Sequence, residues 1–110
     1  MYLYGGYEAG GAGILNDFMC FHIETKLWKP VINNKSSIGS RHSHSLTASG
    51  NKLYLFGGII NTFESSNQVF SFEIGTSTDW KEEKCTGSIP PPLNSHKAIV
   101  YNDEMIIFGG

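Results

Sequence analysis

Two histidines have the spacing of metal ligands on a strand. His42 and His44 stand two residues apart, and alternate residues of a strand face the same side, where two imidazoles can share a metal ion. The nearby sequence offers no third ligand, and His44 recurs as His96 fifty-two residues later. A recurring position indicates a structural histidine, so we expect no metal site and no cofactor.

The segment from Gly5 to Gly13 is rich in glycine and follows an expected strand, as a phosphate-binding loop does. It lacks the Lys-Ser or Lys-Thr pair and the following helix whose N-terminus would hold an anion. We therefore interpret it as a loop with several turns.

Other catalytic signals are missing from the sequence. It contains no Gly-x-Ser-x-Gly elbow, no metalloprotease motif and no paired carboxylates on one expected strand. Cys20 and Cys85 have no Cys-x-x-Cys spacing, which argues against a zinc site and a disulfide scaffold. We expect no catalytic residues.

Composition narrows the class of protein. The 110 residues carry eight basic and ten acidic side chains, a formal net charge of −2. Binding to nucleic acid or an anionic membrane surface requires clustered Lys and Arg, so neither is expected. No apolar run approaches the length of about 18 residues that spans a bilayer. The first fifteen residues have no Lys or Arg, unlike a secretory signal. We expect an intracellular, cytoplasmic protein, with the nucleus as a second compartment.

An internal repeat organises the whole chain. The hexapeptide Met1–Gly6 returns as Leu53–Gly58 and as Met105–Gly110, so its period is 52 residues. Trp28 and Trp80 keep the same period. Turn signals divide one period into four strands, a pattern typical of a propeller blade. The four expected strands are His42–Ala48, Lys52–Phe56, Val69–Ile74 and Trp80–Cys85.

These motifs resemble the kelch repeat: a strand ending in Gly-Gly, an Asn-Asp-x-Phe-x-x-Phe strand, a Thr-x-x-Trp turn and a Ser-x-His strand. The long period is more similar to the long-repeat kelch proteins than to the BTB-kelch adaptors. The second copy departs from the first at Leu93, which replaces Arg41, and at Gln68, which replaces Asp17.

The resemblance implies an all-β fold of four-stranded antiparallel blades, an incomplete propeller of about two blades. Residues 1–40 would give three strands of one blade, 41–92 a complete blade, and 93–110 the first two strands of the next. We expect a segment of a longer kelch chain, with further blades or other copies of the chain as neighbours. The structural marks of the repeat are Gly5, Gly6, Trp28, His44, Gly57, Gly58, Trp80, His96, Gly109 and Gly110.

Binding residues are expected on one face. Loops after the second and fourth strands of a blade share a face, and here they are the longer ones: Gly6–Leu15, Asn33–Ser40, Ile59–Ser66 and Thr86–Asn94. Long loops concentrate binding functions, and the resemblance implies a partner-binding face there. The candidates are Tyr7, Glu8, Arg41, Ile59, Ile60 and Phe63. In the alternative interpretation, Ile59, Ile60 and Phe63 fold back onto the blade.

The favoured function is a non-catalytic scaffold or adaptor that binds another protein or peptide. Two alternatives stay open. The chain could be the propeller part of an enzyme similar to galactose oxidase or a sialic acid epimerase, although Cys20 is interpreted as a packing residue. It could also be a docking or regulatory segment attached to a catalytic domain such as a phosphatase.

Overall fold

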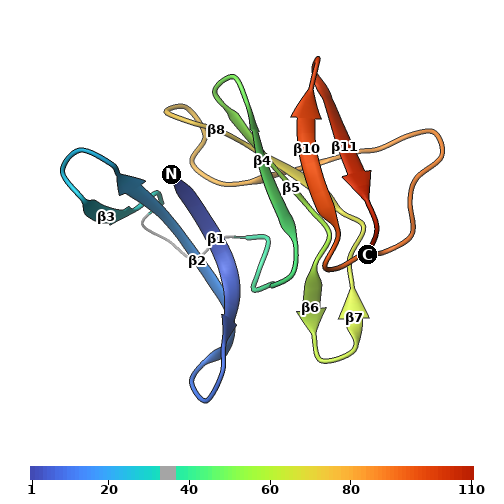
Figure 1. The fold of residues 1–110 in the computed structure, drawn as a ribbon, viewed down its shortest axis with the longest axis horizontal. Coiled ribbons are helices and arrows are strands. Elements are labelled where there is room, and N and C mark those ends of the chain that lie inside the picture. Colours follow the sequence, from blue (N-terminus) through green and yellow to red (C-terminus); the bar gives the residue numbers. More distant parts are fainter. Residues whose placement is uncertain (33–36) are drawn as a thin grey trace.

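The computed structural model describes residues 1–32 and 37–110, and within them the chain forms strands and turns without a helix (Figure 1). Residues 33–36, the first part of the expected loop Asn33–Ser40, lie outside the described residues. The strands form three sheets that follow one another along the chain, and a small separate hairpin. All strand pairs are antiparallel. The all-β prediction is therefore confirmed.

The sheets follow chain order. The first contains β1 (Tyr2–Glu8), β2 (Gly13–His22) and β3 (Leu27–Pro30). The second contains β4 (Ser45–Ser49), β5 (Lys52–Phe56), β8 (Val69–Glu73) and β9 (Lys81–Glu83). The third contains β10 (Lys97–Tyr101) and β11 (Glu104–Phe108), and the separate hairpin contains β6 (Ile59–Asn61) and β7 (Glu64–Ser65).

The second sheet has the four expected strands, but three of them are shorter than predicted, β8 only by its last residue, Ile74. β4 begins at Ser45 instead of His42, because Ser43 has a φ of 57° and this left-handed conformation interrupts the extended chain. β9 covers Lys81–Glu83, so Trp80 and Cys85 lie just outside it. The short β4–β5 and β8–β9 turns lie on the side opposite the β6–β7 hairpin (Figure 1).

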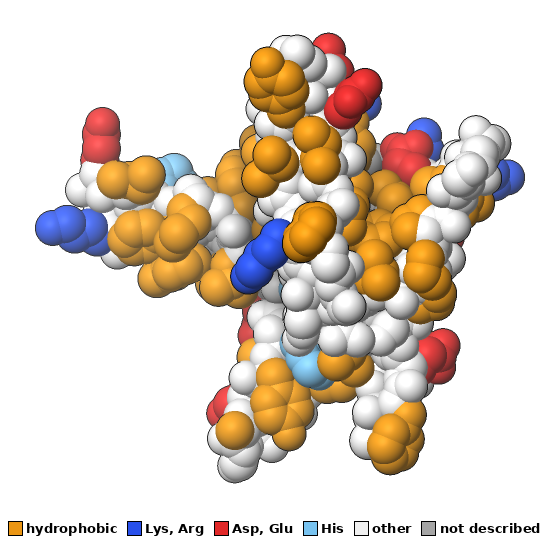
Figure 2. Space-filling view, turned by 45° about the vertical axis from the view of Figure 1, so that its right-hand side comes forward, with side chains coloured by type: hydrophobic (Ala, Val, Ile, Leu, Met, Phe, Trp, Pro, Cys, Tyr) orange, Lys and Arg blue, Asp and Glu red, His pale blue; other side chains and the backbone are white. Residues whose placement is uncertain are grey.

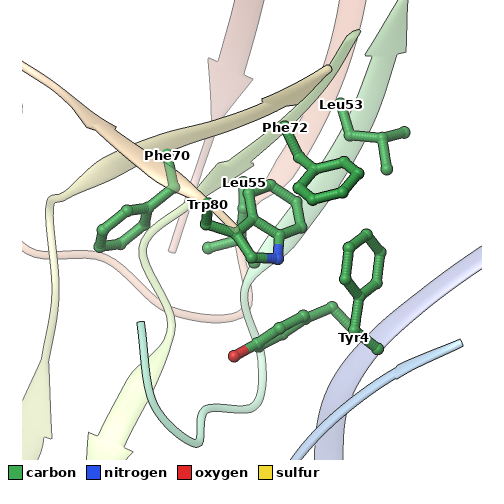
Figure 3. Packing of buried hydrophobic residues seen from close by; sticks show 7 residues of the cluster. Tyr4, Leu53, Leu55, Phe70, Phe72 and Trp80 are labelled. Carbon is green, nitrogen blue, oxygen red and sulfur yellow. The ribbon is translucent and has the colours of Figure 1, made fainter. Parts of the chain in front are cut away.

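An aromatic cluster joins the first sheet to the second (Figure 3). Trp80 is 5% exposed and packs edge-on against Tyr4, with ring centroids 5.6 Å apart. Phe18 meets Phe72 at 5.0 Å in a T-shaped arrangement. Such pairs add about 0.5–1.5 kcal/mol each to the gain from burying apolar area. Trp28 holds the equivalent place in the first sheet but is 46% exposed, because no other described sheet packs on its far side.

The double glycine closes each junction between sheets. The Gly6 N–H donates to the Arg41 carbonyl at 2.8 Å, and the Gly58 N–H donates to the Leu93 carbonyl at 2.8 Å. At Gly57, φ is 70° and a Cβ would lie 2.7 Å from the Leu93 carbonyl oxygen. Glycine is required there by both the conformation and the close approach of the next segment. We call this arrangement the glycine clasp: a Gly-Gly pair, at the register shift within β1 and directly after β5, bonded to the segment that enters the next sheet.

The glycine clasp predicts a large difference between two Gly→Ala substitutions. Gly50 has a similar φ of 59°, but its Cβ would meet no atom within 4 Å. Gly50→Ala should therefore cost only the left-handed strain, about 1 kcal/mol, whereas Gly57→Ala adds a backbone clash and should cost about 3 kcal/mol or more. Chemical denaturation of the full-length protein measures both. Equal losses of stability in the two variants would contradict the clasp.

Candidate partner-binding groove

Two β-hairpins project from the same side of the sheets (Figure 1). The first prong is the end of the β1–β2 hairpin, residues 6–15, in which Tyr7 pairs with Ile14 and Glu8 with Gly13. The second prong is the β6–β7 hairpin, residues 59–65, in which Asn61 pairs with Glu64. Figure 2 shows both prongs extending from the lower edge of the molecule with an open space between them.

A groove of about 490 Å³ lies between the prongs. Its apolar walls come from Tyr7 and Ile14 on one side and Ile59 on the other. The complete lining is Tyr7, Gly13, Ile14, His42, Ile59, Asn61 and Thr62. The groove therefore combines apolar walls with a few polar groups, as ligand-binding clefts commonly do.

His42 links the two prongs at the groove. Its ring packs on Tyr7 of the first prong, with centroids 5.4 Å apart. Its backbone pairs with Ile59 of the second prong, through N–H···O distances of 3.1 and 2.8 Å. The ring Nδ1 lies 3.0 Å from the Ser43 hydroxyl. The sequence predicted His42 beside His44 on one strand, and this is wrong because the turn at Ser43 separates them.

Five of the six candidate binding residues lie on the prongs. Tyr7 is 61% exposed and Phe63, at the tip of the second prong, is 96% exposed. Glu8 is exposed, and Ile59 and Ile60 are half-buried. The interpretation in which Phe63 folds back onto the blade does not hold in the structure. Sequence reasoning did not find Ile14, Asn61 and Thr62, which face the groove only through the register of the two hairpins.

Arg41 requires a correction, because it is 1% exposed and not available to a partner. Its guanidinium donates to the carbonyl of Gly57 at 2.9 Å and to that of Ile38 at 3.0 Å. It also lies over the Phe70 ring, 4.9 Å from the centroid. Burial lowers the pKa of Arg41 below its usual value. The side chain ties the entering segment to the glycine clasp, a structural task.

His44 and His96 occupy equivalent positions in the repeat, where His96 is buried and His44 is half-buried. Each ring hydrogen-bonds to the backbone of the preceding sheet, His44 to Tyr4 and His96 to Phe56. His96 also has its Nε2 2.9 Å from the Ser45 hydroxyl. Burial is the main cause that lowers the pKa of both rings, to about 4 for His44, where nearby Arg41 adds to the effect. The Nδ1 atoms of both are buried with no hydrogen-bond partner among the described residues. A proton added to either would have no acceptor.

A larger cavity of about 660 Å³ lies between the second and third sheets. Tyr54 and Val69 line it, and they follow Tyr2 and Phe18 by one repeat. At the first junction the corresponding space is filled by Trp80. Among the described residues β10 and β11 have no further strand beside them, and no counterpart of Trp80 lines this cavity.

In residues 1–32 and 37–110, no three His, Cys, Asp or Glu side chains are grouped as metal ligands, and no helix is long and apolar enough to cross a bilayer. Cys20 is half-buried and lies opposite Tyr2 in the β1–β2 register. Burial, followed by the proximity of Cys20, raises the pKa of Tyr2.

Comparison with known proteins gives consistent matches. Residues 1–110 match the family model described as the KLHDC2/KLHL20/DRC7 Kelch-repeats domain. The chain is 34% identical over 117 residues to Kelch domain-containing protein 3 of Rattus norvegicus, covering 100% of this chain and 31% of that protein. It is 29% identical over 116 residues to the Leucine-zipper-like transcriptional regulator 1 homolog of Drosophila melanogaster, covering 100% of this chain and 12% of that protein.

Among solved structures, that of YjhT aligns with a TM-score of 0.67 at 18% identity, covering 86% of this chain and 26% of that one. This likeness bears on the fold alone. The successive antiparallel sheets and their repeated clasps define an incomplete β-propeller. The chain belongs to the kelch-repeat family. It spans about a third of the length of the first curated relatives it matches, and the family match supports a protein-interaction propeller module.

His44, at the first junction, predicts a pH-dependent stability. The folded state holds His44 neutral down to about pH 4, whereas the unfolded chain takes up the proton near pH 6.5. The free energy of unfolding is therefore at its full value above pH 6.5 and falls between pH 6.5 and 4, by up to about 3 kcal/mol. Carboxylates titrate in the same window, so the measurement is the difference between the wild-type protein and His44→Gln in denaturation at several pH values.

His22 is exposed and provides the matched control. The His22→Gln variant should keep the wild-type pH profile, whereas His44→Gln should show a flatter one. Parallel profiles for wild type and His44→Gln would rule out the neutral His44 as a source of the pH dependence.

Proposed function

We propose that this kelch segment is a non-catalytic binding module that holds a segment of a partner protein between its two prongs. The observation that supports the proposal most directly is the apolar surface of the groove and prong tip, formed by the exposed rings of Tyr7 and Phe63 and by the half-buried Ile59. A solvated hairpin gains nothing for its own stability from a Phe that is 96% exposed. Exposed apolar groups clustered around a concave site are typical of interaction surfaces.

The prongs are suited to this role because their bases are fixed. Gly6 is bonded to Arg41, and Ile59 is paired with His42, so both prongs start from the same entering segment. A groove whose walls are held before binding loses less conformational entropy when a partner is bound. The affinity would depend on a few anchors, of which Tyr7 is the most favourable by residue type.

The proposed compartment is the cytoplasm, with the nucleus as a second site of action. Cys20 and Cys85 are both free thiols, which suits a reducing environment.

The scaffold role follows from the same proposal, because a module that binds without catalysis contributes by bringing its partner to the other parts of the full-length protein.

Displayed random peptides provide the test. A library is selected on the full-length protein, and enriched peptides are synthesised and titrated by calorimetry. Tyr7→Ala removes the ring that forms one wall of the groove, and Ile59→Asn changes the other wall. Each should weaken binding by about tenfold or more, the loss typical of an interface anchor.

Ile23→Ala is the matched control, since Ile23 is exposed in the β2–β3 turn, away from the prongs. It should leave the affinity unchanged. Peptides that bind equally well to the Tyr7, Ile59 and Ile23 variants would overturn the groove as the binding site. Failure to enrich any peptide would count against a peptide-binding function.

A further inference from the structure

The lining of the groove carries neither acidic side chains nor lysine or arginine. Among residues 1–32 and 37–110, its apolar walls come from Tyr7 and Ile14 on the first prong and from Ile59 on the second. The other lining residues are small or polar: Gly13, His42, Asn61 and Thr62. A partner held between the walls would therefore meet no carboxylate, ammonium or guanidinium group there.

The charged residues closest to the groove in sequence are placed elsewhere. Glu8 follows Tyr7 along β1, and because side chains alternate along a strand it lies on the other face of the first hairpin. Glu64 is outside the lining, and its carboxylate accepts a hydrogen bond from the Asn61 amide at 2.9 Å. Figure 2 shows the acidic side chains of the prongs on their outer flanks. Arg41 is buried, and its guanidinium donates to two backbone carbonyls.

This distribution of charge decides which side chain the groove can hold. A charged side chain between the walls exchanges part of its water for Tyr7, Ile14 and Ile59 and gains no opposite charge from the lining. Such a transfer is unfavourable for either sign of charge. An aliphatic or aromatic side chain instead gains from the removal of apolar area from water, and a ring can also pair with the exposed ring of Tyr7.

Two hydroxyl groups of the lining residues have no hydrogen bond within the described part of the chain, those of Tyr7 and Thr62. Both residues are exposed. A hydroxyl group can donate one hydrogen bond and accept others, so it can bond to either the N–H or the C=O of a peptide group. A protein segment offers such groups along its whole backbone, which suits a peptide better than a purely apolar ligand.

We infer that the groove takes a segment of a partner protein that is anchored by one uncharged apolar side chain. The anchor would lie between Tyr7 and Ile59, and the backbone beside it would bond to the hydroxyls of Tyr7 and Thr62. This inference rests on the proposed function, since it names the chemistry of the partner for the same groove. Because no ion pair contributes, the affinity should depend little on salt.

The test begins with the peptide library selected on the full-length protein. Each residue of one enriched peptide is replaced by Ala in turn, and binding to the wild-type protein and to Tyr7→Ala is measured by calorimetry. The anchor is the residue whose replacement weakens binding to the wild type but has little further effect on binding to Tyr7→Ala, since only residues in contact are coupled in this way. We expect Phe, Tyr, Trp, Leu, Ile or Met at that position.

The anchor is then replaced by norleucine, Lys or Glu. Norleucine has a straight side chain like that of Lys but without the ammonium group. The norleucine peptide should bind within about threefold of the parent, whereas the Lys and Glu peptides should each bind about tenfold or more weakly, whichever the sign of the charge. The affinity of the parent peptide should be the same at low and high salt.

Protein variants locate the contacts. Tyr7→Phe and Thr62→Val each remove one hydroxyl group and should weaken binding about threefold, the net loss expected for one hydrogen bond. Tyr101→Phe is the matched control, because Tyr101 is exposed at the end of β10, away from the prongs. It should leave the affinity unchanged, and so should the double variant Glu8→Gln, Glu64→Gln.

The outcomes separate this inference from the proposed function. A Lys or Glu peptide that binds as tightly as the parent and still loses affinity with Tyr7→Ala would overturn the apolar anchor and retain the groove. A weaker affinity in the double Glu variant would do the same. Full affinity in both Tyr7→Phe and Thr62→Val would overturn the backbone contact.

Three results would overturn both the inference and the proposed function. The first is binding that is insensitive to Tyr7→Ala and Ile59→Asn, and the second is a library from which no peptide is enriched. The third comes from sedimentation of the full-length protein without peptide. A dimer that Tyr7→Ala converts to monomer would assign the groove to a second copy of the chain.

Discussion

The glycine clasp is the contact on which the rest of the structure depends. At each junction a backbone N–H of the Gly-Gly pair bonds to a carbonyl of the segment entering the next sheet, with the same 2.8 Å distance at Gly6 and Gly58. This contact brings neighbouring sheets close enough for Trp80 to lie against Tyr4. The contact also fixes the position of His42, the residue after Arg41. His42 in turn contacts both prongs, with its ring on Tyr7 and its backbone on Ile59. The groove is therefore a consequence of how two sheets are joined.

The sequence was sufficient for the fold because the repeat constrains the positions that pack. The Gly-Gly pairs recur at a period of 52 residues, and Trp80 and His96 follow Trp28 and His44 by the same period. Gly6, Gly58, Trp80 and His96 lie at the junctions between successive sheets. Four antiparallel strands of a blade followed from turn signals between apolar runs, and their order is correct. The predicted start of β4 was wrong because Ser43 has a left-handed conformation. The sequence does not indicate this, since serine adopts that conformation far less often than glycine does.

The site was less accessible to sequence reasoning, and Arg41 shows why. A single Arg directly after an expected loop suggests an exposed anchor. Its burial depends instead on two carbonyl acceptors and the Phe70 ring, which come from distant or irregular segments. The next repeat has Leu93 there, so the repeat itself gave no sign of a polar contact. Desolvation of a guanidinium is costly unless hydrogen bonds replace water, and the carbonyls of Gly57 and Ile38 supply them. His42 was misplaced for a similar reason, since its neighbours belong to different hairpins.

The register shifts at the bases of the prongs have an evolutionary consequence. The β1–β2 pairing is irregular between Tyr4 and Gly6, and the β6–β7 pairing between Ile59 and Asn61, so each hairpin beyond those points is set apart from its sheet. Side chains alternate along a strand, and a one-residue insertion at the base would exchange the places of Tyr7 and Glu8. Insertions at the tips leave Tyr7, Ile14 and Ile59 in their places. Lineages of this repeat can therefore lengthen their hairpins at the outer ends, changing reach while the scaffold and the groove floor are inherited intact.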